Sequence, residues 1–159
     1  MSETRIRPAR AGEADLLSDL ALRSKAHWGY DEAFLEACRA ELTYTEAQIR
    51  AGGLVVAAGQ DDRPVGFYRI HGEPPDGELA ALFVDPVRIG TGAGGALLRH
   101  ALAAAAEAGF DSLGLDADPD AEAFYAHAGA TRVGHTASGS IPGRRLPRMR
   151  FDLGPSQLN

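Results

Sequence analysis

The spacing of hydrophobic residues changes along the chain. In the first third, apolar residues such as Leu16, Leu17 and Leu20 recur at helical intervals, which predicts a helix that ends near Lys25. From Leu54 onwards, short apolar runs alternate with turn residues, as is typical of strands. The pattern therefore predicts a mainly helical N-terminal third, followed by a region dominated by a sheet.

The same patterns locate the individual elements. Strands are expected at residues 4–7, 54–58, 64–70, 78–84, 112–116, 131–136 and 146–153. Further helices are expected after a cap at Asp31, from Thr45, at about residues 92–108, and from Asp118 to Gly129. Turns at 59–63 and 73–77 indicate antiparallel hairpins, whereas the helix at 92–108 joins two strands in a β-α-β unit. The fold class predicted is mixed α/β.

Length and composition limit the organisation. With 159 residues and 45% hydrophobic content, we expect one domain over residues 1–159, with residues 154–159 as a flexible tail. The net charge of −6 argues against a general nucleic-acid binder, which needs a basic surface. No run has the hydrophobic length of a signal peptide or membrane span, so we expect a cytoplasmic protein with no membrane partner. The richness in Ala, Gly and Arg is typical of high-GC bacteria.

Cysteine and histidine usage offers no metal or disulfide chemistry. Cys38 is the only cysteine, so no intramolecular disulfide can form. The five histidines are not paired with acids at a ligand spacing, and we therefore expect no metal site.

A glycine-rich segment follows the strand that ends at Val84. Its four glycines fall within six positions and precede a helix; they are Gly90, Gly92, Gly94 and Gly95. Glycines lack the Cβ atoms that keep a ligand off the backbone, and a helix N-terminus presents unpaired N–H groups with a positive dipole. The segment therefore predicts a site for a pyrophosphate.

These glycines also match a dinucleotide-binding motif, and a P-loop is a further alternative. The spacing of Gly90, Gly92 and Gly95 matches a dinucleotide fingerprint, and Asp116 follows about twenty residues on, where a ribose-binding acid belongs. However, residues 85–89 separate this loop from its strand, and antiparallel strands precede it. The loop contains no lysine, which also disfavours a P-loop.

Three motifs point to a particular family. They are Leu82-Phe83-Val84-Asp85-Pro86, the loop Gly90-Thr91-Gly92-Ala93-Gly94 followed by Leu97-Leu98, and Asp118-x-x-Ala121-x-x-x-Tyr125-x-x-x-Gly129. With these motifs in this order, the chain resembles the GNAT superfamily of N-acetyltransferases over essentially its whole length. The resemblance implies a mostly antiparallel sheet of about six to seven strands, splayed between the fourth and the fifth, and flanked by helices.

The resemblance also implies acetyl-coenzyme A as the cofactor. Backbone amides of the loop would hold its pyrophosphate, and the main chain at the end of the preceding strand would bind the pantetheine arm. Ile89 stands where the family has Gln or Arg, and Asp118 stands where many relatives have Asn. The expected cofactor-binding residues are Leu82, Phe83, Val84, Ile89, Gly90, Thr91, Gly92, Ala93, Gly94, Gly95, Asp118 and Ala121.

Two residues are candidates for proton transfer. Tyr125 occupies the family's position for the general acid, and a phenol with a pKa of about 10 suits protonation of a thiolate whose thiol has a pKa near 8.5. The alternative is that Tyr125 packs its helix against the sheet. Glu78 is the leading candidate for the base, because relatives often carry a glutamate on this strand. Glu73, His71 and His27 are competitors.

The acceptor is expected to be a primary amine of a small molecule or peptide. The resemblance places the early helices and the last hairpin loop around it, and the candidate residues are His27, Trp28, Tyr30, His71, Ser138 and Arg144. For Arg144, as for Arg145, Arg148 and Arg150, an exposed basic surface is an equal alternative to carboxylate binding. A homodimer is possible by analogy with the family. The alternative functions are a non-catalytic acyl-coenzyme A-binding or regulatory domain and an NAD-binding oxidoreductase domain.

Overall fold

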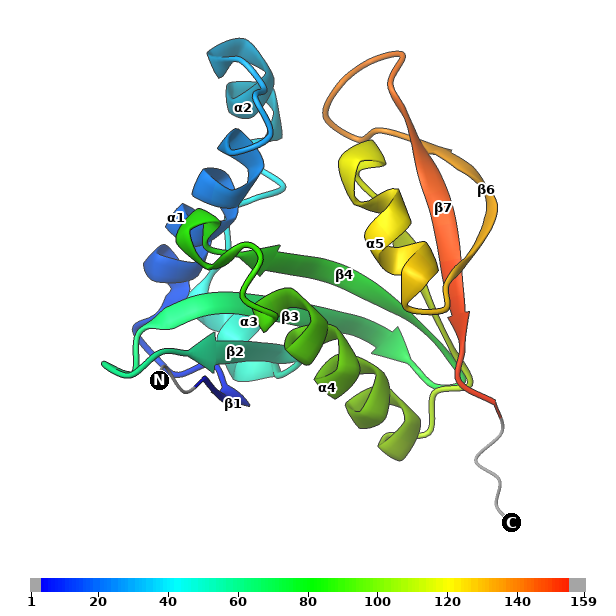
Figure 1. Cartoon of the computed structure of the whole chain (residues 1–159), viewed down its shortest axis with the longest axis horizontal. Helices are drawn as coiled ribbons and strands as arrows, with labels where there is room; N and C mark the ends of the chain where they lie inside the picture. Colours follow the sequence, from blue (N-terminus) through cyan, green and yellow to red (C-terminus); the bar gives the residue numbers. More distant parts are fainter. Residues whose placement is uncertain (1–3, 155–159) are drawn as a thin grey trace. The chain divides into compact units, whose positions relative to one another are not determined.

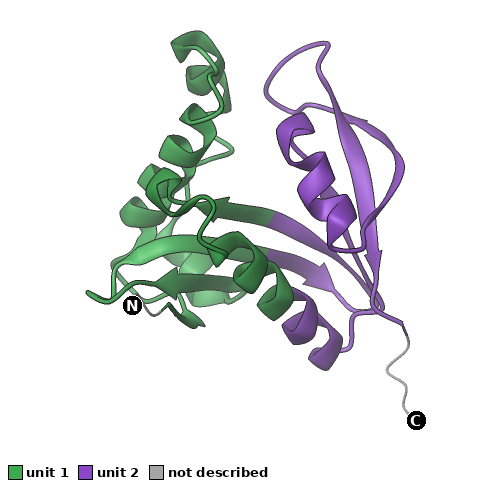
Figure 2. Cartoon of the chain, in the orientation of Figure 1, with its two compact units in different colours: residues 1–69, 81–101 green, residues 70–80, 102–159 purple. Residues whose placement is uncertain are grey.

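Strands and helices follow one another much as the hydrophobic spacing predicts, over residues 4–154, which the computed structural model describes (Figure 1). Residues 155–159, most of the predicted tail, lie outside the described residues. The contacts divide the described chain into two compact units (Figure 2). Unit 1 holds the residues up to Arg69 and Ala81–Ala101; unit 2 holds Ile70–Ala80 and the residues from Leu102 onwards. That the whole chain is one domain stays a prediction.

Within the described residues, seven strands form one sheet in the order β1-β2-β3-β4-β5-β7-β6. The strands are β1 (Arg5–Pro8), β2 (Leu54–Ala58), β3 (Pro64–Glu73), β4 (Asp76–Val84), β5 (Ser112–Asp116), β6 (Thr131–Ala137) and β7 (Arg145–Asp152). Strand β4 is parallel to β5, and the pairs β1–β2, β2–β3, β5–β7 and β6–β7 are antiparallel. The register pairs only Asp76–Glu78 of β4 with β5, so the sheet splays along β4. The predicted fold class is confirmed.

The helices also follow the prediction. They are α1 (Ala14–Ala26), α2 (Glu32–Cys38), α3 (Glu46–Ala51), α4 (Ala93–Glu107) and α5 (Glu122–His127), with short 3-10 turns η1 (Pro86–Arg88) and η2 (Pro119–Ala121). Asp31 caps α2 by accepting a hydrogen bond from the Phe34 N–H, as the sequence indicates. Thr45 and Gln48 form a capping box at the start of α3.

The core of unit 1 fixes the start of α4 against the sheet. Leu97 and Leu98 of α4 are buried together with Phe67 of β3. A Cβ atom on Gly66 would lie 2.8 Å from Cδ1 of Leu97, so glycine is what allows the helix to approach β3 this closely. Because α4 is packed in this way, the end of the loop that leads into it is fixed.

The core of unit 2 lies between α5 and the strands β5 and β7. Leu113, Leu115, Met149 and Phe151 are buried on β5 and β7, and Tyr125 of α5 meets Phe151 edge to face at 6.4 Å. Apolar residues thus alternate with polar ones along both strands, and the polar side chains lie on the other side of this part of the sheet.

Two boundaries differ from the sequence-based prediction. The turn expected at residues 73–77 contains only Pro74 and Pro75, because β3 runs to Glu73 and β4 begins at Asp76, where it pairs with Ser112 of β5. The turn η1 was not predicted. It forms because Asp85 caps it, accepting from the Val87 N–H at 3.1 Å, and because proline suits the first position of a helical turn.

Candidate functional site

The glycine loop of unit 1 connects β4 to α4 through η1. Its base is fixed by the Asp85 N–H, which donates to the Val65 carbonyl at 2.8 Å. Thr91 closes the loop, since both its N–H and its hydroxyl donate to the Arg88 carbonyl. Gly90 and Gly92 have φ values of +87° and +92°, a backbone conformation that favours glycine. The glycines therefore set the path of the chain into α4.

The loop leaves open space beside a helix N-terminus. Among the described residues, no atom comes within 4 Å of a Cβ built on Gly90 or on Gly92. Helix α4 is 15 residues long, has no acidic residue in its first turn, and offers first-turn N–H groups that no intrahelical carbonyl can accept. This arrangement suits an anion such as a pyrophosphate.

Two arginines flank the loop in the sequence: Arg88 precedes it, and Arg99 lies within α4. The guanidinium of Arg88 is packed at Gly59, where a Cβ would lie 2.9 Å from its Nη2 atom. Ile89, at the family's Gln or Arg position, is 41% exposed. Arg99, in the second turn of α4, has its Nη1 atom 3.3 Å from the position of a Cβ on Gly95. Sequence reasoning missed Arg99; its spacing of four residues from Gly95 was the available signal.

The end of β4 belongs to unit 1. Leu82, Phe83 and Val84 are half-buried there, and the Phe83 ring packs against Phe67 at 5.7 Å. The backbone of this segment lies close to β3, since the Phe83 carbonyl would be 3.0 Å from a Cβ on Gly66.

In unit 2, Tyr125 combines a buried ring with a hydroxyl that has no partner among the residues that the structure describes. The residue is 7% exposed, and its hydroxyl makes no hydrogen bond to the described residues. All fully buried side-chain polar atoms of the described chain do have partners, so the Tyr125 oxygen must reach the surface. Burial, together with the nearby negative charge of Asp118, raises the pKa of Tyr125 well above its ordinary value. The phenol is therefore protonated at neutral pH.

Asp118 and Arg144 were predicted for different roles, and the structure pairs them. The Asp118 carboxylate lies 3.7 Å from Nη2 of Arg144 and also accepts from the Asp120 N–H at 3.0 Å, which caps η2. Ala121 ends η2 and directly precedes α5. The loop before β7 is held from within by Ser138, whose hydroxyl oxygen accepts from the N–H groups of Ser140 and Ile141. The ion pair between Asp118 and Arg144 connects this hairpin loop to the turn that precedes the Tyr125 helix.

Glu78, the candidate base, is engaged by an arginine from another strand. Arg148 of β7 donates from Nη1 to Oε2 of Glu78 at 2.9 Å and from Nη2 to Oε1. The same guanidinium donates to Asp116 at 3.1 Å. Asp116, the ribose-binding acid of the dinucleotide alternative, is thus committed to an ion pair. Sequence reasoning grouped Arg148 with Arg144, Arg145 and Arg150 and did not predict its pairing with Glu78.

The predicted acceptor residues near α1 form an aromatic group in unit 1. His27 and Trp28 meet edge to face at 5.1 Å, and Trp28 is 48% exposed. The Tyr30 ring stacks on Phe34 at 4.1 Å, with the Lys25 ammonium 5.4 Å from the Tyr30 centroid. His71 lies in unit 2 and is exposed on β3.

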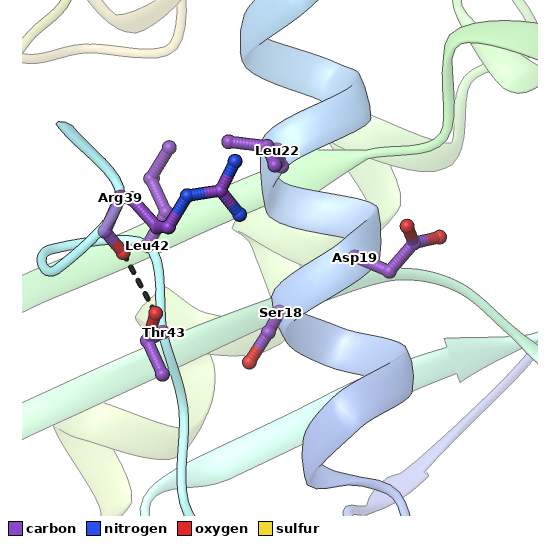
Figure 3. Close-up of a pocket in the computed structure, with 6 residues that line it drawn as sticks. All are labelled: Ser18, Asp19, Leu22, Arg39, Leu42 and Thr43. Atoms are coloured by element: carbon purple, nitrogen blue, oxygen red, sulfur yellow. Dashed lines mark hydrogen bonds between the residues drawn. The ribbon is translucent and has the colours of Figure 1, made fainter. Parts of the chain in front are cut away.

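A pocket of about 230 Å³ lies elsewhere in unit 1, between α1 and the chain after α2 (Figure 3). It is lined by Ser18, Asp19, Leu22, Arg39, Leu42 and Thr43. Its two hydroxyls are already used, since Thr43 donates to the Arg39 carbonyl and Ser18 bonds the backbone of Tyr44. None of the predicted site residues lines it.

The described residues form neither a metal-binding cluster nor a membrane-spanning helix. Residues 4–154 contain no group of three or more His, Cys, Asp or Glu side chains arranged to hold a metal ion. Over the same range, no helix has the length and hydrophobicity required to cross a membrane.

The glycine loop, its helix and the tyrosine motif lie within a segment that matches a known family. Residues 20–130 match the model of the acetyltransferase (GNAT) family. The chain belongs to this family. Its members use acetyl-coenzyme A, and the protein is an acetyl-coenzyme A-dependent acyltransferase.

Solved structures share the GNAT fold. A GCN5-related N-acetyltransferase from Rhodopseudomonas palustris is 24% identical, with a TM-score of 0.76 over 96% of this chain and 97% of that one. The PaiA N-acetyltransferase from Thermoplasma acidophilum, in complex with coenzyme A, is 19% identical, with a TM-score of 0.76 over 94% and 99%. The ribosomal-protein-S18-alanine N-acetyltransferase from Escherichia coli is 15% identical, with a TM-score of 0.73 over 99% and 98%. A comparison with curated protein sequences gives no match.

The loop of this GNAT protein fits the coenzyme by its chemistry. Backbone N–H donors, open space at two glycines and a helix of 15 residues suit a pyrophosphate, without a side-chain cation at position 89. The residues of the loop that would supply these donors are Gly90 and residues 92–95, since the Thr91 N–H is bonded to the Arg88 carbonyl.

Proposed function

We propose that the protein transfers an acetyl group from acetyl-coenzyme A to a primary amine of a small molecule or peptide, directly and within a ternary complex. The observation that carries this proposal is Tyr125, a buried phenol whose hydroxyl reaches the surface and makes no hydrogen bond to residues 4–154. A domain that only bound acyl-coenzyme A would not need such a proton donor. The bound thioester supplies an acetyl group that is activated towards an amine.

In this proposal the loop holds the coenzyme through its backbone. The N–H groups of Gly90 and of residues 92–95 bind the pyrophosphate, Thr91 and Ile89 border it, and Arg99 adds a cation in the second turn of α4. The main chain of Leu82, Phe83 and Val84 binds the pantetheine arm as an added strand would. Asp118 and Ala121 are assigned to coenzyme binding as well, as the resemblance implies.

The chain moves two protons in the reaction. As the nitrogen–carbon bond forms and the carbon–sulfur bond breaks, the Tyr125 hydroxyl gives its proton to the departing sulfur and regains one from the acetylated nitrogen. The acceptor must first be neutral, and its ammonium proton passes to Glu78, through water. Arg148 occupies one lone pair on each Glu78 oxygen, but a carboxylate has about four acceptor sites, so two remain for this purpose.

Acceptor recognition is assigned from the resemblance to the family. We assign this role to His27, Trp28, Tyr30, His71, Ser138 and Arg144. By analogy with the family we also expect a homodimer, which light scattering measures, and a bacterial, cytoplasmic setting.

Two measurements test the proposal. Acetyl-coenzyme A should raise the melting temperature of the protein and NAD should not, because ligands that bind the native state stabilise it. A thiol-release assay over a panel of primary amines should then give turnover with at least one acceptor. Stabilisation by acetyl-coenzyme A without turnover on any amine would instead favour the binding or regulatory domain, and stabilisation by NAD alone would favour the oxidoreductase.

A further inference from the structure

Three strands of unit 2 contribute to one ion-paired cluster. Glu78 comes from β4, Asp116 from β5 and Arg148 from β7. Arg148 lies directly opposite Asp116 in the register, whereas Glu78 is on the strand beyond. To reach Glu78, the arginine side chain must therefore cross the whole width of β5.

Gly114 leaves the space in which the Arg148 side chain crosses β5. It pairs with Glu78 on β4, and a Cβ atom at this position would lie 2.9 Å from Oε1 of Glu78 and closer still to Nη2 of Arg148. Any other residue at this position would push the guanidinium away from Glu78. Glycine costs a strand stability, so a buried glycine in mid-strand indicates a close approach, here by a side chain.

The contact between Arg148 and Glu78 differs from an ordinary surface ion pair. It is bidentate, it joins residues 70 positions apart, and both side chains are about two-thirds buried, with 31% and 38% exposed. The hydrogen bonds to Glu78 are the main reason that the pKa of Arg148 is raised. By contrast, Arg150 on the same strand pairs with Asp152 through one contact of 3.1 Å and is 52% exposed.

We infer that Arg148 is a positioning residue: it passes over Gly114 to fix the Glu78 carboxylate so that its two remaining acceptor sites face the amine acceptor. The inference rests on the proposed function, in which Glu78 receives the amine proton. Glu78 lies at the last registered pair of β4 with β5, where the sheet begins to splay. Without the guanidinium, two carboxylates would face each other with no cation, and Glu78 would turn away from Asp116.

The first experiment compares two arginines of β7. Arg148→Met should lower kcat in the thiol-release assay by about tenfold to a hundredfold, the range typical of misplaced catalytic groups. The stabilisation by acetyl-coenzyme A should stay as in the wild type. Arg148→Lys, which keeps the charge, should recover part of the loss. Arg150→Met is the matched control and should leave kcat unchanged.

The second experiment keeps every charge. In Gly114→Ala only the flexible ends of Arg148 and Glu78 must shift, so the variant should fold and yet lose kcat in the same way as Arg148→Met. In a double-mutant cycle, Glu78→Gln with Arg148→Met should be no slower than Glu78→Gln alone. The losses in melting temperature should likewise be less than additive, a readout that requires no turnover.

The outcomes separate this inference from the proposed function. If the wild type acetylates an amine and Arg148→Met does so at the same rate, the positioning role is wrong and the proposed function stands. Additive losses of kcat or of melting temperature also contradict the role. If the wild type acetylates no amine, the proposed function fails and the catalytic role of Arg148 fails with it.

Discussion

The hydroxyl of Tyr68 and Nδ1 of His100 lie 2.8 Å apart, and this hydrogen bond connects β3 to α4 within unit 1. Tyr68 is 1% exposed, whereas His100 lies on the exposed side of the helix. With Nδ1 unprotonated, Tyr68 donates and the histidine accepts. Helix α4, which begins at the glycine loop, is thus held by a polar contact as well as by Leu97 and Leu98.

Tyr68→Phe should lower the free energy of unfolding by about 0.5–1.5 kcal/mol, the usual net value of one hydrogen bond. The loss should be modest because the freed His100 nitrogen is exposed and can bond water. Urea denaturation measures it. His100→Ala and the double variant complete the cycle, and losses that simply add would show that the two residues are not coupled.

Gly92→Ala should weaken coenzyme A binding by about tenfold, measured by isothermal titration calorimetry. The new Cβ would project where the loop is open, and φ at this position is strained for alanine. Gly12→Ala is the matched control, since Gly12 has the same φ of +92° and an equally open Cβ position, but precedes α1. Equal affinity in the two variants would mean that the loop does not hold the coenzyme.

Most of the fold follows from local signals in the sequence. The alternation of apolar residues located every strand, and the cap at Asp31 located α2, because these signals act over a few residues. The limits of β3 and β4 were less accurate, because the pairing of Asp76 with Ser112, 36 positions away, decides where β4 begins. Pairing between distant strands leaves no periodic trace in the sequence.

The candidate site was likewise predicted where its motifs are local, and missed where its residues are far apart in the sequence. The glycine loop and Tyr125 were found because their motifs are continuous in the sequence. The pairing of Arg148 with Glu78 was missed, because the two residues lie 70 positions apart and three arginines on one strand do not show which of them is ion-paired. Gly114 was the one available hint, since a glycine within an apolar strand marks a close approach.

Tyr125→Phe should lower kcat by about a hundredfold, a typical contribution of a general acid, and leave the affinity for coenzyme A nearly unchanged. The variant removes only the hydroxyl, which makes no hydrogen bond to the described residues, so the melting temperature should stay close to that of the wild type. Thiol release, calorimetry and thermal unfolding measure the three quantities. An unchanged kcat would remove Tyr125 from the mechanism and leave it a packing role against Phe151.

The protein should lose stability as the pH rises from about 10 to 12. Burial raises the pKa of both Tyr44 and Tyr68 to about 12, whereas both ionise near pH 10 once unfolded. The neutral tyrosines therefore stabilise the folded state fully below pH 10, and this contribution declines through pH 12. Each can add a slope of at most about 1.4 kcal/mol per pH unit.

Urea denaturation at several pH values between 8 and about 11.5 would measure this loss. The double variant Tyr44→Phe and Tyr68→Phe should show a shallower decline than the wild type, because its phenylalanines cannot ionise in the unfolded chain. Tyr125 remains in both proteins, and its raised pKa adds the same slope to each. Parallel curves for the two proteins would show that the buried hydroxyls of Tyr44 and Tyr68 do not govern alkaline unfolding.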